Sequence, residues 1–184
     1  MRITNMSKQS NASKKTTSYW LKGLGQLLII AIAFIALSVF LSRNMLDTQQ
    51  PAPLLTLNKH LSPLEPDGKN QRPIINKEHS TLVYFFAPWC TVCALSQPSL
   101  SAFANVRPEI NIVMIALDWE SADQVKAFQQ QHDFEHSILL GDDAIKQQWR
   151  VDAYPSYYFV DKNGNITSKD RGLVTLPGLI TRAL

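Results

Sequence analysis

Cys90 and Cys93 are the only two cysteines of the chain, and two residues separate them in the stretch FFAPWCTVCALSQP. The residues before the pair are apolar and β-rich and those after it have helical spacing, so we expect a strand-to-helix junction. A thiolate in the first turn of a helix faces unpaired N–H groups and the positive end of the helix dipole, which lower its pKa from about 8.5 toward roughly 3.5–7.5. The spacing places the second sulfur one turn away. The pattern predicts a redox dithiol with Cys90 as the exposed nucleophile and Cys93 as the buried resolving thiol.

Three other interpretations of the pair remain open on sequence grounds. A structural zinc site needs about four ligands. His132 and His136 supply an H-x3-H pair, but 38 residues separate Cys93 from His132, against about 12 to 15 in a zinc finger. A permanent disulfide would close so short a loop that it would constrain the unfolded chain little. Two small core residues are the third possibility, and that interpretation leaves the position of the pair beside Trp89 unexplained.

Strand-like and helix-like segments alternate from residue 81 onward. The hairpin is the strongest local signal, because Asn163-Gly164 stands between two β-rich runs. Strands that alternate with helices and end in a hairpin predict an α/β domain whose sheet is partly parallel and closes with an antiparallel pair. The expected elements are strands at 81–87, 110–118 and 137–141, helices at 93–106, 121–134 and 142–149, the hairpin around 163–164, and a short last helix at 175–184.

The cysteine segment resembles the active-site segment of thioredoxin-like proteins, with a buried strand, Ala-x-Trp, Cys-x-x-Cys and a proline, Pro98, five residues after the second cysteine. Downstream, VDAYPSYYFVDKNGNI is similar to that family's second signature, a strand entered through a cis-proline and followed by Asp-x-x-Gly. The resemblance covers roughly residues 73–184 and extends to the membrane-tethered TlpA-like group. Within that group the chain resembles the suppressor-of-copper-sensitivity proteins through Trp-Cys-x-Val-Cys and a closing Gly-x-x-Thr-x-x-Gly-Leu, which is Gly172, Thr175, Gly178 and Leu179.

This resemblance implies a thioredoxin-like fold, a central mixed sheet with flanking helices. It implies a cis bond between Tyr154 and Pro155, in a loop that lies against the sulfurs and pairs with a bound substrate strand. Trp89 and Tyr154 would then form an apolar rim for the client. The chemistry resides in the Cys90–Cys93 disulfide itself, so we expect no cofactor and no metal ligand in the site.

Two positions depart from the family pattern. Classical thioredoxins have a buried aspartate six residues before the first cysteine, and here that residue is Tyr84. Many TlpA-like reductases carry a glutamate three residues after the second cysteine, and here it is Ser96. Deprotonation of Cys93 would therefore depend on water, on Tyr84, or on no dedicated group.

An apolar run precedes the domain. LGQLLIIAIAFIALSVFL, at 24–41, has no charged residue, and a helix of this length spans roughly 27 Å, close to the hydrocarbon thickness of a bilayer. Residues 1–43 hold six of the 18 basic residues and no acid, so the other 12 basic residues against 15 acids leave −3 for the remainder. The basic balance is therefore attributed to membrane topology rather than to nucleic acid. A cleaved secretory signal is the alternative, although SVFLSRN lacks a good Ala-x-Ala site.

The expected organisation is a cytoplasmic tail at 1–19, a transmembrane signal anchor at 20–42, a linker at 43–72 with a short strand at 54–57, and a thioredoxin-like domain at 73–184. The anchor would place the protein in the inner (cytoplasmic) membrane as a single-pass protein, with the amino terminus in the cytoplasm and the catalytic domain in the periplasm or otherwise outside the cytoplasm. The sequence thus favours a membrane-anchored thiol:disulfide oxidoreductase with client protein thiols or disulfides and a membrane electron-transfer partner. A copper-binding thiolate module and a docking-only domain are the alternatives.

Overall fold

The computed structural model describes residues 25–33, 36, 43–57, 59–64, 74–75, 78–132 and 136–183. The chain divides into two compact units, Met1–Arg43 and Asn44–Leu184. All elements named below belong to the second unit.

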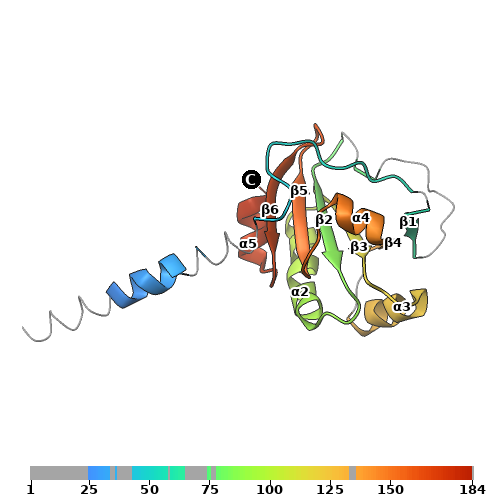
Figure 1. The fold of residues 1–184 in the computed structure, drawn as a ribbon, viewed down its shortest axis with the longest axis horizontal. Coiled ribbons are helices and arrows are strands. Elements are labelled where there is room, and N and C mark those ends of the chain that lie inside the picture. Colours follow the sequence, from blue (N-terminus) through green and yellow to red (C-terminus); the bar gives the residue numbers. More distant parts are fainter. Residues whose placement is uncertain are drawn as a thin grey trace, which may run out of the picture. The chain divides into compact units, whose positions relative to one another are not determined.

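The second unit is built on a six-stranded mixed sheet with the strand order β1-β4-β3-β2-β5-β6 (Figure 1). The middle strand β2 (Thr81–Phe86) is buried at every position. It runs parallel to β3 (Asn111–Ala116) and antiparallel to β5 (Ser156–Val160). The outer strands are β4 (Ile138–Gly141), β1 (Leu61–Pro63) and β6 (Ile166–Arg171). The sheet is thus partly parallel and closes with the antiparallel β5–β6 hairpin, as the sequence predicts.

Helices cover one face of this sheet. The helices α2 (Thr91–Val106), α3 (Ala122–Gln131) and α5 (Leu176–Arg182) contribute buried residues to one core cluster together with alternate positions of β2. Phe103 of α2 packs edge-on against Phe159 of β5, and Phe128 of α3 stacks on Phe86. This face contains both cysteines.

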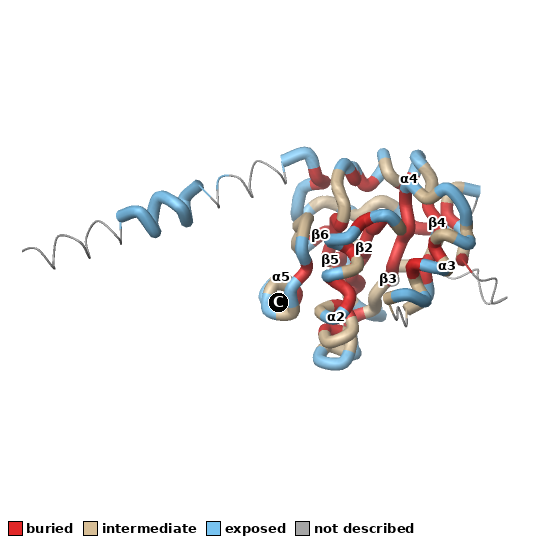
Figure 2. Tube along the Cα trace, turned by 90° about the horizontal axis from the view of Figure 1, so that it is seen from below, coloured by how far each residue is buried: buried red, intermediate tan, exposed pale blue. Residues whose placement is uncertain are grey.

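The opposite face is covered by α4 (Asp143–Gln148) and by the segment that follows Arg43. Trp149, at the end of α4, packs against Phe85 and Tyr158. Figure 2 shows the resulting pattern, in which buried residues follow the strands and exposed residues lie on the outer turns of the helices. The strand β2 lies between the two cores and contributes side chains to both, which is why it is apolar without alternation.

Part of the segment predicted to be a linker packs on this second face. Met45 and Leu55 are buried, and the backbone of residues 49–52 is hydrogen-bonded to the β5–β6 turn through Ile166 and Gly164. The strand expected at 54–57 is absent from the structure, and the short strand lies instead at β1, where it extends the sheet beside β4. The proline-rich composition of the segment is typical of a linker and gives no sign of this packing. Prolines interrupt helices and strands, but they do not prevent an extended segment from lying on an apolar surface.

In the first unit, residues 25–33 and 36 are helical and exposed. Among the residues that the structure describes, no helix has both the length and the apolar character needed to cross a bilayer. The whole tail predicted at 1–19, and more than half of the anchor predicted at 20–42, lie outside the described residues.

Candidate active site

The site lies where β2 ends. The parallel strands β2 and β3 have their carboxyl ends at the same edge of the sheet, which is the edge where α/β proteins place their functional groups. β2 ends at Phe86, and a turn through Trp89 leads directly into α2. The sequence predicts this junction correctly, because an apolar β-rich run gives way to helical periodicity within four residues.

Cys90 and Cys93 are joined by a disulfide. Cys90 is the N-cap of α2, and its Sγ accepts a hydrogen bond from the backbone N–H of Cys93 at 3.1 Å. No acidic residue lies in the first turn of the helix, so nothing on α2 itself opposes a negative charge on this sulfur. The geometry therefore provides the environment that lowers the pKa of a helix-capping thiol.

The two cysteines differ less in burial than the sequence predicts. Cys93 is completely buried, and Cys90, expected to be exposed, retains only 6% of its accessible surface. The reason is the capping role, because the Cys90 side chain turns toward the first turn of α2 rather than toward solvent. Cys90 is still the more accessible of the two.

The loop before β5 stands beside this turn. The Tyr154–Pro155 bond is cis, as expected from the resemblance. The ring of Tyr154 makes an edge contact with Trp89, with 5.7 Å between the ring centroids. The carbonyl of Pro155 accepts a hydrogen bond from Gly172 N at 2.8 Å, which ties the loop to the segment before α5. Trp89, Tyr154 and the disulfide turn are thus brought together from two distant parts of the sequence.

Tyr84 lies on β2 in the same core cluster as the cysteines. Its hydroxyl is buried without a hydrogen-bond partner, and burial raises the pKa of Tyr84 far above its usual value. The Ser96 hydroxyl opposes this rise, although the two groups do not reach full hydrogen-bonding geometry. Tyr84 therefore stays protonated at neutral pH, and it cannot serve as a phenolate base.

Ser96 serves the packing of α2. Its hydroxyl donates to Val92 O at 2.8 Å and accepts from Val174 N at 3.1 Å. It is completely buried and fastens the loop before α5 to the helix. Within the described part of the chain, no carboxylate is among the buried side chains, so the acid expected from the family pattern has no buried substitute there.

Asp118 and Lys146 are neighbours of the site that sequence reasoning missed. The carbonyl of Asp118 accepts a hydrogen bond from Trp89 Nε1 at 3.0 Å, and its carboxylate binds Lys146 Nζ with distances of 2.6 and 2.9 Å. The order of the strands could have revealed Asp118. This residue follows a buried strand, and it reaches the site only because that strand, β3, lies next to β2 and runs parallel to it.

The motif Gly-x-x-Thr-x-x-Gly-Leu has a structural explanation in this chain. Gly172 adopts φ of +89°, a conformation that side chains disfavour, and Thr175 is the N-cap of α5. Gly178 N donates to Thr175 Oγ1, and a Cβ at Gly178 would lie 2.9 Å from that oxygen. Leu179 is completely buried. These residues form the turn before the last helix, cap its amino end and anchor it in the core.

Metal ligands do not gather in the described residues. No group of three His, Cys, Asp or Glu side chains among them could hold an ion. His132, one of the two histidines of the zinc interpretation, packs its ring on Phe128 at the end of α3, with 4.7 Å between centroids.

Comparison with known proteins places the chain in a family. The model of the AhpC/TSA family matches residues 48–169. The thioredoxin-like protein YneN of Bacillus subtilis (strain 168) is 27% identical over 167 residues, which cover 85% of this chain and 91% of YneN.

Solved structures share the fold. StoA from Bacillus subtilis is 18% identical with a TM-score of 0.58, over 72% of this chain and all of that one. A protein from Chlorobium tepidum that was assigned as a thiol:disulfide interchange protein DsbE is 18% identical with a TM-score of 0.62, over 74% of this chain and 95% of that one. With the Cys-x-x-Cys pair at the helix start, these matches identify the chain as a member of the AhpC/TSA family of thioredoxin-like thiol-disulfide oxidoreductases.

Proposed function

We propose that the protein is a membrane-tethered, exported thiol:disulfide oxidoreductase that exchanges its dithiol with client proteins through a mixed disulfide. The observation that carries the proposal is the position of Cys90 at the N-cap of α2, with its sulfur against the Cys93 N–H. This arrangement stabilises a thiolate on the residue that remains accessible and keeps the second sulfur buried one turn away.

The exchange proceeds in two displacements. In the reduced protein the Cys90 thiolate attacks one sulfur of a client disulfide, and the other client sulfur leaves as a thiolate that takes up a proton. The Cys93 thiolate then attacks Cys90 Sγ, closes the Cys90–Cys93 disulfide and releases the second client thiol. The client gains two electrons and the protein loses two, and the reverse sequence oxidises a client dithiol.

The client is an apolar, extended protein segment. Three large exposed side chains, Trp89, Val92 and Leu95, surround the start of α2, and Leu173 is exposed in the loop that Ser96 fastens to this helix. Exposed apolar residues gathered in one place are typical of interaction sites. Trp89 and Tyr154 would contact the client segment with their rings, whereas Pro155 is buried and would reach the client only through its backbone.

The tether is proposed from the apolar run at 24–41 and its basic flank, with the amino terminus in the cytoplasm and the catalytic unit in the periplasm. A membrane electron-transfer partner would then restore the dithiol or the disulfide after each cycle. The helical state of residues 25–33 is compatible with this proposal.

Trapping of the mixed disulfide tests the mechanism. In Cys93→Ala the resolving thiol is missing, so we expect the full-length protein to accumulate client adducts through Cys90 that dithiothreitol releases. Cys90→Ala is the matched control and should form none. Equal adduct levels in the two variants, or none in either, would contradict the proposal.

The direction of electron flow follows from the redox potential. A value near −270 mV, as in thioredoxin, would make the protein a reductase, and one near −120 mV an oxidant, because the reduced form is then stabilised. Equilibration of the full-length protein in glutathione buffers of stated ratio, with thiols counted by alkylation, measures it. Failure to cycle between dithiol and disulfide would exclude redox function.

A copper-binding function is the second candidate, and the closeness of the two cysteines favours it, since thiolates suit Cu(I) and their Cα atoms are only 5.2 Å apart. The motif that suggested a copper-tolerance protein gives it no support, because its residues cap and turn α5. Titration of the reduced protein with Cu(I) against a chelator distinguishes the two: a tight one-to-one complex would favour metal protection.

A further inference from the structure

Four residues from four separate segments form a closed ring of contacts beside the disulfide. Trp89 donates its indole N–H to the backbone carbonyl of Asp118, and the Asp118 carboxylate binds Lys146 with both oxygens. Lys146 Nζ lies 5.9 Å from the centre of the Tyr154 ring, a cation–π distance. The edge contact between Tyr154 and Trp89 closes the ring.

The ion pair in this ring is partly shielded from water. About 30% of the Lys146 side chain and 29% of the Asp118 side chain remain accessible, so the pair is screened less than one at the open surface. Asp118 adopts φ of +49°, in the left-handed region that aspartate enters more readily than most non-glycine residues. The hydroxyl of Tyr154 is buried without a hydrogen-bond partner. Burial first, and then the negative charge of Asp118, raises the pKa of Tyr154.

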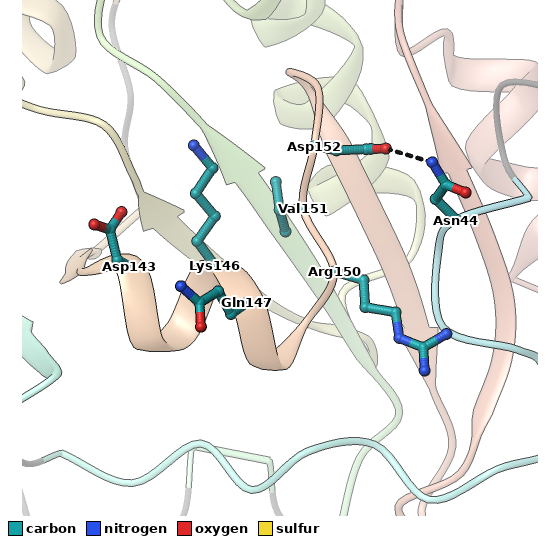
Figure 3. Close-up of a pocket in the computed structure, with 7 residues that line it drawn as sticks. All are labelled: Asn44, Asp143, Lys146, Gln147, Arg150, Val151 and Asp152. Atoms are coloured by element: carbon teal, nitrogen blue, oxygen red, sulfur yellow. Dashed lines mark hydrogen bonds between the residues drawn. The ribbon is translucent and has the colours of Figure 1, made fainter.

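Lys146 also lines a pocket of about 450 Å³ beside α4, but it does not act there with the pocket's other cation. Figure 3 shows Lys146 and Arg150 extending in different directions, so the two charges do not converge on a common ligand. The partner of Lys146 is Asp118, outside that pocket.

We propose that Asp118 and Lys146 are positioning residues that set specificity for protein clients by holding the touching rings of Trp89 and Tyr154 as one fixed apolar surface beside Cys90. The inference rests on the proposed function. Trp89 is 61% exposed, so without the ring its large side chain would be free to change rotamer. A side chain that is already fixed loses less conformational freedom when a client binds. A small disulfide makes few contacts with this surface, so its reaction with Cys90 should depend little on how firmly the two rings are held.

Two substrates with the same chromophore separate these effects. One is 5,5′-dithiobis(2-nitrobenzoate), and the other is a decapeptide of apolar residues whose single cysteine carries thionitrobenzoate as a mixed disulfide. Reduced full-length protein releases the thionitrobenzoate anion from each, and Cys93 then closes the protein disulfide and releases the second thiol. Reduction of either substrate is strongly favourable, whether the protein normally acts as a reductase or as an oxidant of its clients.

The variants are Asp118→Asn, Lys146→Met, their combination, and Lys146→Arg as the conservative replacement. We expect the ratio of the peptide rate constant to the small-disulfide rate constant to fall roughly tenfold in both single variants. The loss should appear as a higher half-saturating peptide concentration with a similar limiting rate. The double variant should be no worse than either single one, and Lys146→Arg should recover most of the ratio.

Glu109→Gln is the matched control, because it breaks an ion pair with Arg107 just beyond α2, at the opposite end of the helix from Cys90. It should leave the ratio unchanged. The inference is overturned if both substrates slow equally in the Asp118 and Lys146 variants, or if the ratio stays at the wild-type value. If Asp118→Asn fails to fold, the comparison of Lys146→Met with Lys146→Arg decides the question alone. If the wild-type protein reacts with neither substrate, the proposed function fails rather than this inference.

Discussion

Tyr84 shows how one side chain changes the chemistry expected at a position. A carboxylate there would accept a proton from Cys93, whereas a buried phenol with a raised pKa can only donate one. Among the described residues no carboxylate is buried, and the Ser96 hydroxyl is engaged both as a donor to Val92 O and as an acceptor from Val174 N. We therefore expect water to accept the Cys93 proton.

The Tyr84 hydroxyl also has a consequence for stability. Because it is buried without a partner, we expect Tyr84→Phe to leave the free energy of unfolding unchanged or to raise it by up to about 1 kcal/mol. Urea unfolding of the oxidised protein measures this difference.

Tyr158→Phe provides the matched comparison. Its hydroxyl donates to Trp149 O and accepts from Leu46 N, so removing it should cost about 1–3 kcal/mol and leave buried groups unpaired. A Tyr84→Phe loss as large as that of Tyr158→Phe would show that the Tyr84 hydroxyl has a partner after all.

At the scale of elements, the start of α5 illustrates how a short helix is fixed. Seven residues are too few to form a stable helix in water. The helix depends on the Thr175 cap and on burial of Leu179 against the face that also holds α2.

Removal of the cap tests this dependence. We expect Thr175→Ala to lower the free energy of unfolding by about 1 kcal/mol, because Gly178 N loses its acceptor. Thr175→Ser keeps the oxygen and should restore most of the stability. Equal losses in both variants would mean that the threonine methyl group, rather than the cap, matters.

At the scale of the whole molecule, the two cores on either side of the sheet bury most of the phenols of the chain. Four of the five tyrosines, Tyr84, Tyr154, Tyr157 and Tyr158, have pKa values raised chiefly by burial, with Tyr158 at about 12. In the unfolded chain they would ionise near their usual value of about 10.

This difference predicts alkaline instability. At pH values between the unfolded and folded pKa values, the unfolded state binds fewer protons than the folded state. The stability that these tyrosines contribute is therefore fully present below about pH 10 and falls as the pH rises above it. Absorbance at 295 nm should show these four phenols ionising together with loss of near-ultraviolet circular dichroism. Ionisation of all five near pH 10 in a protein that remains folded would contradict the prediction.

The order of the elements could be predicted from the sequence because it depends on local periodicity. The strand before Cys90, the helix after it and the Asn163-Gly164 hairpin each carry their own signal. The segment after Arg43 could not be placed, since its proline-rich composition is that of a linker and only the exposed apolar face of the sheet explains why Met45 and Leu55 are buried.

The sequence by itself determined the dithiol and its place at the start of a helix, because both follow from residues that are neighbours in the chain. Only the tertiary structure decided what surrounds it. The parallel pairing of β2 and β3 carries Asp118 to Trp89, and α4 brings Lys146 to both Asp118 and Tyr154. The contacts of Asp118 with Trp89 and with Lys146 span 29 and 28 residues, and the contact of Lys146 with Tyr154 depends on how α4 packs beside the loop before β5. No local pattern encodes them, because they arise only when the sheet is assembled.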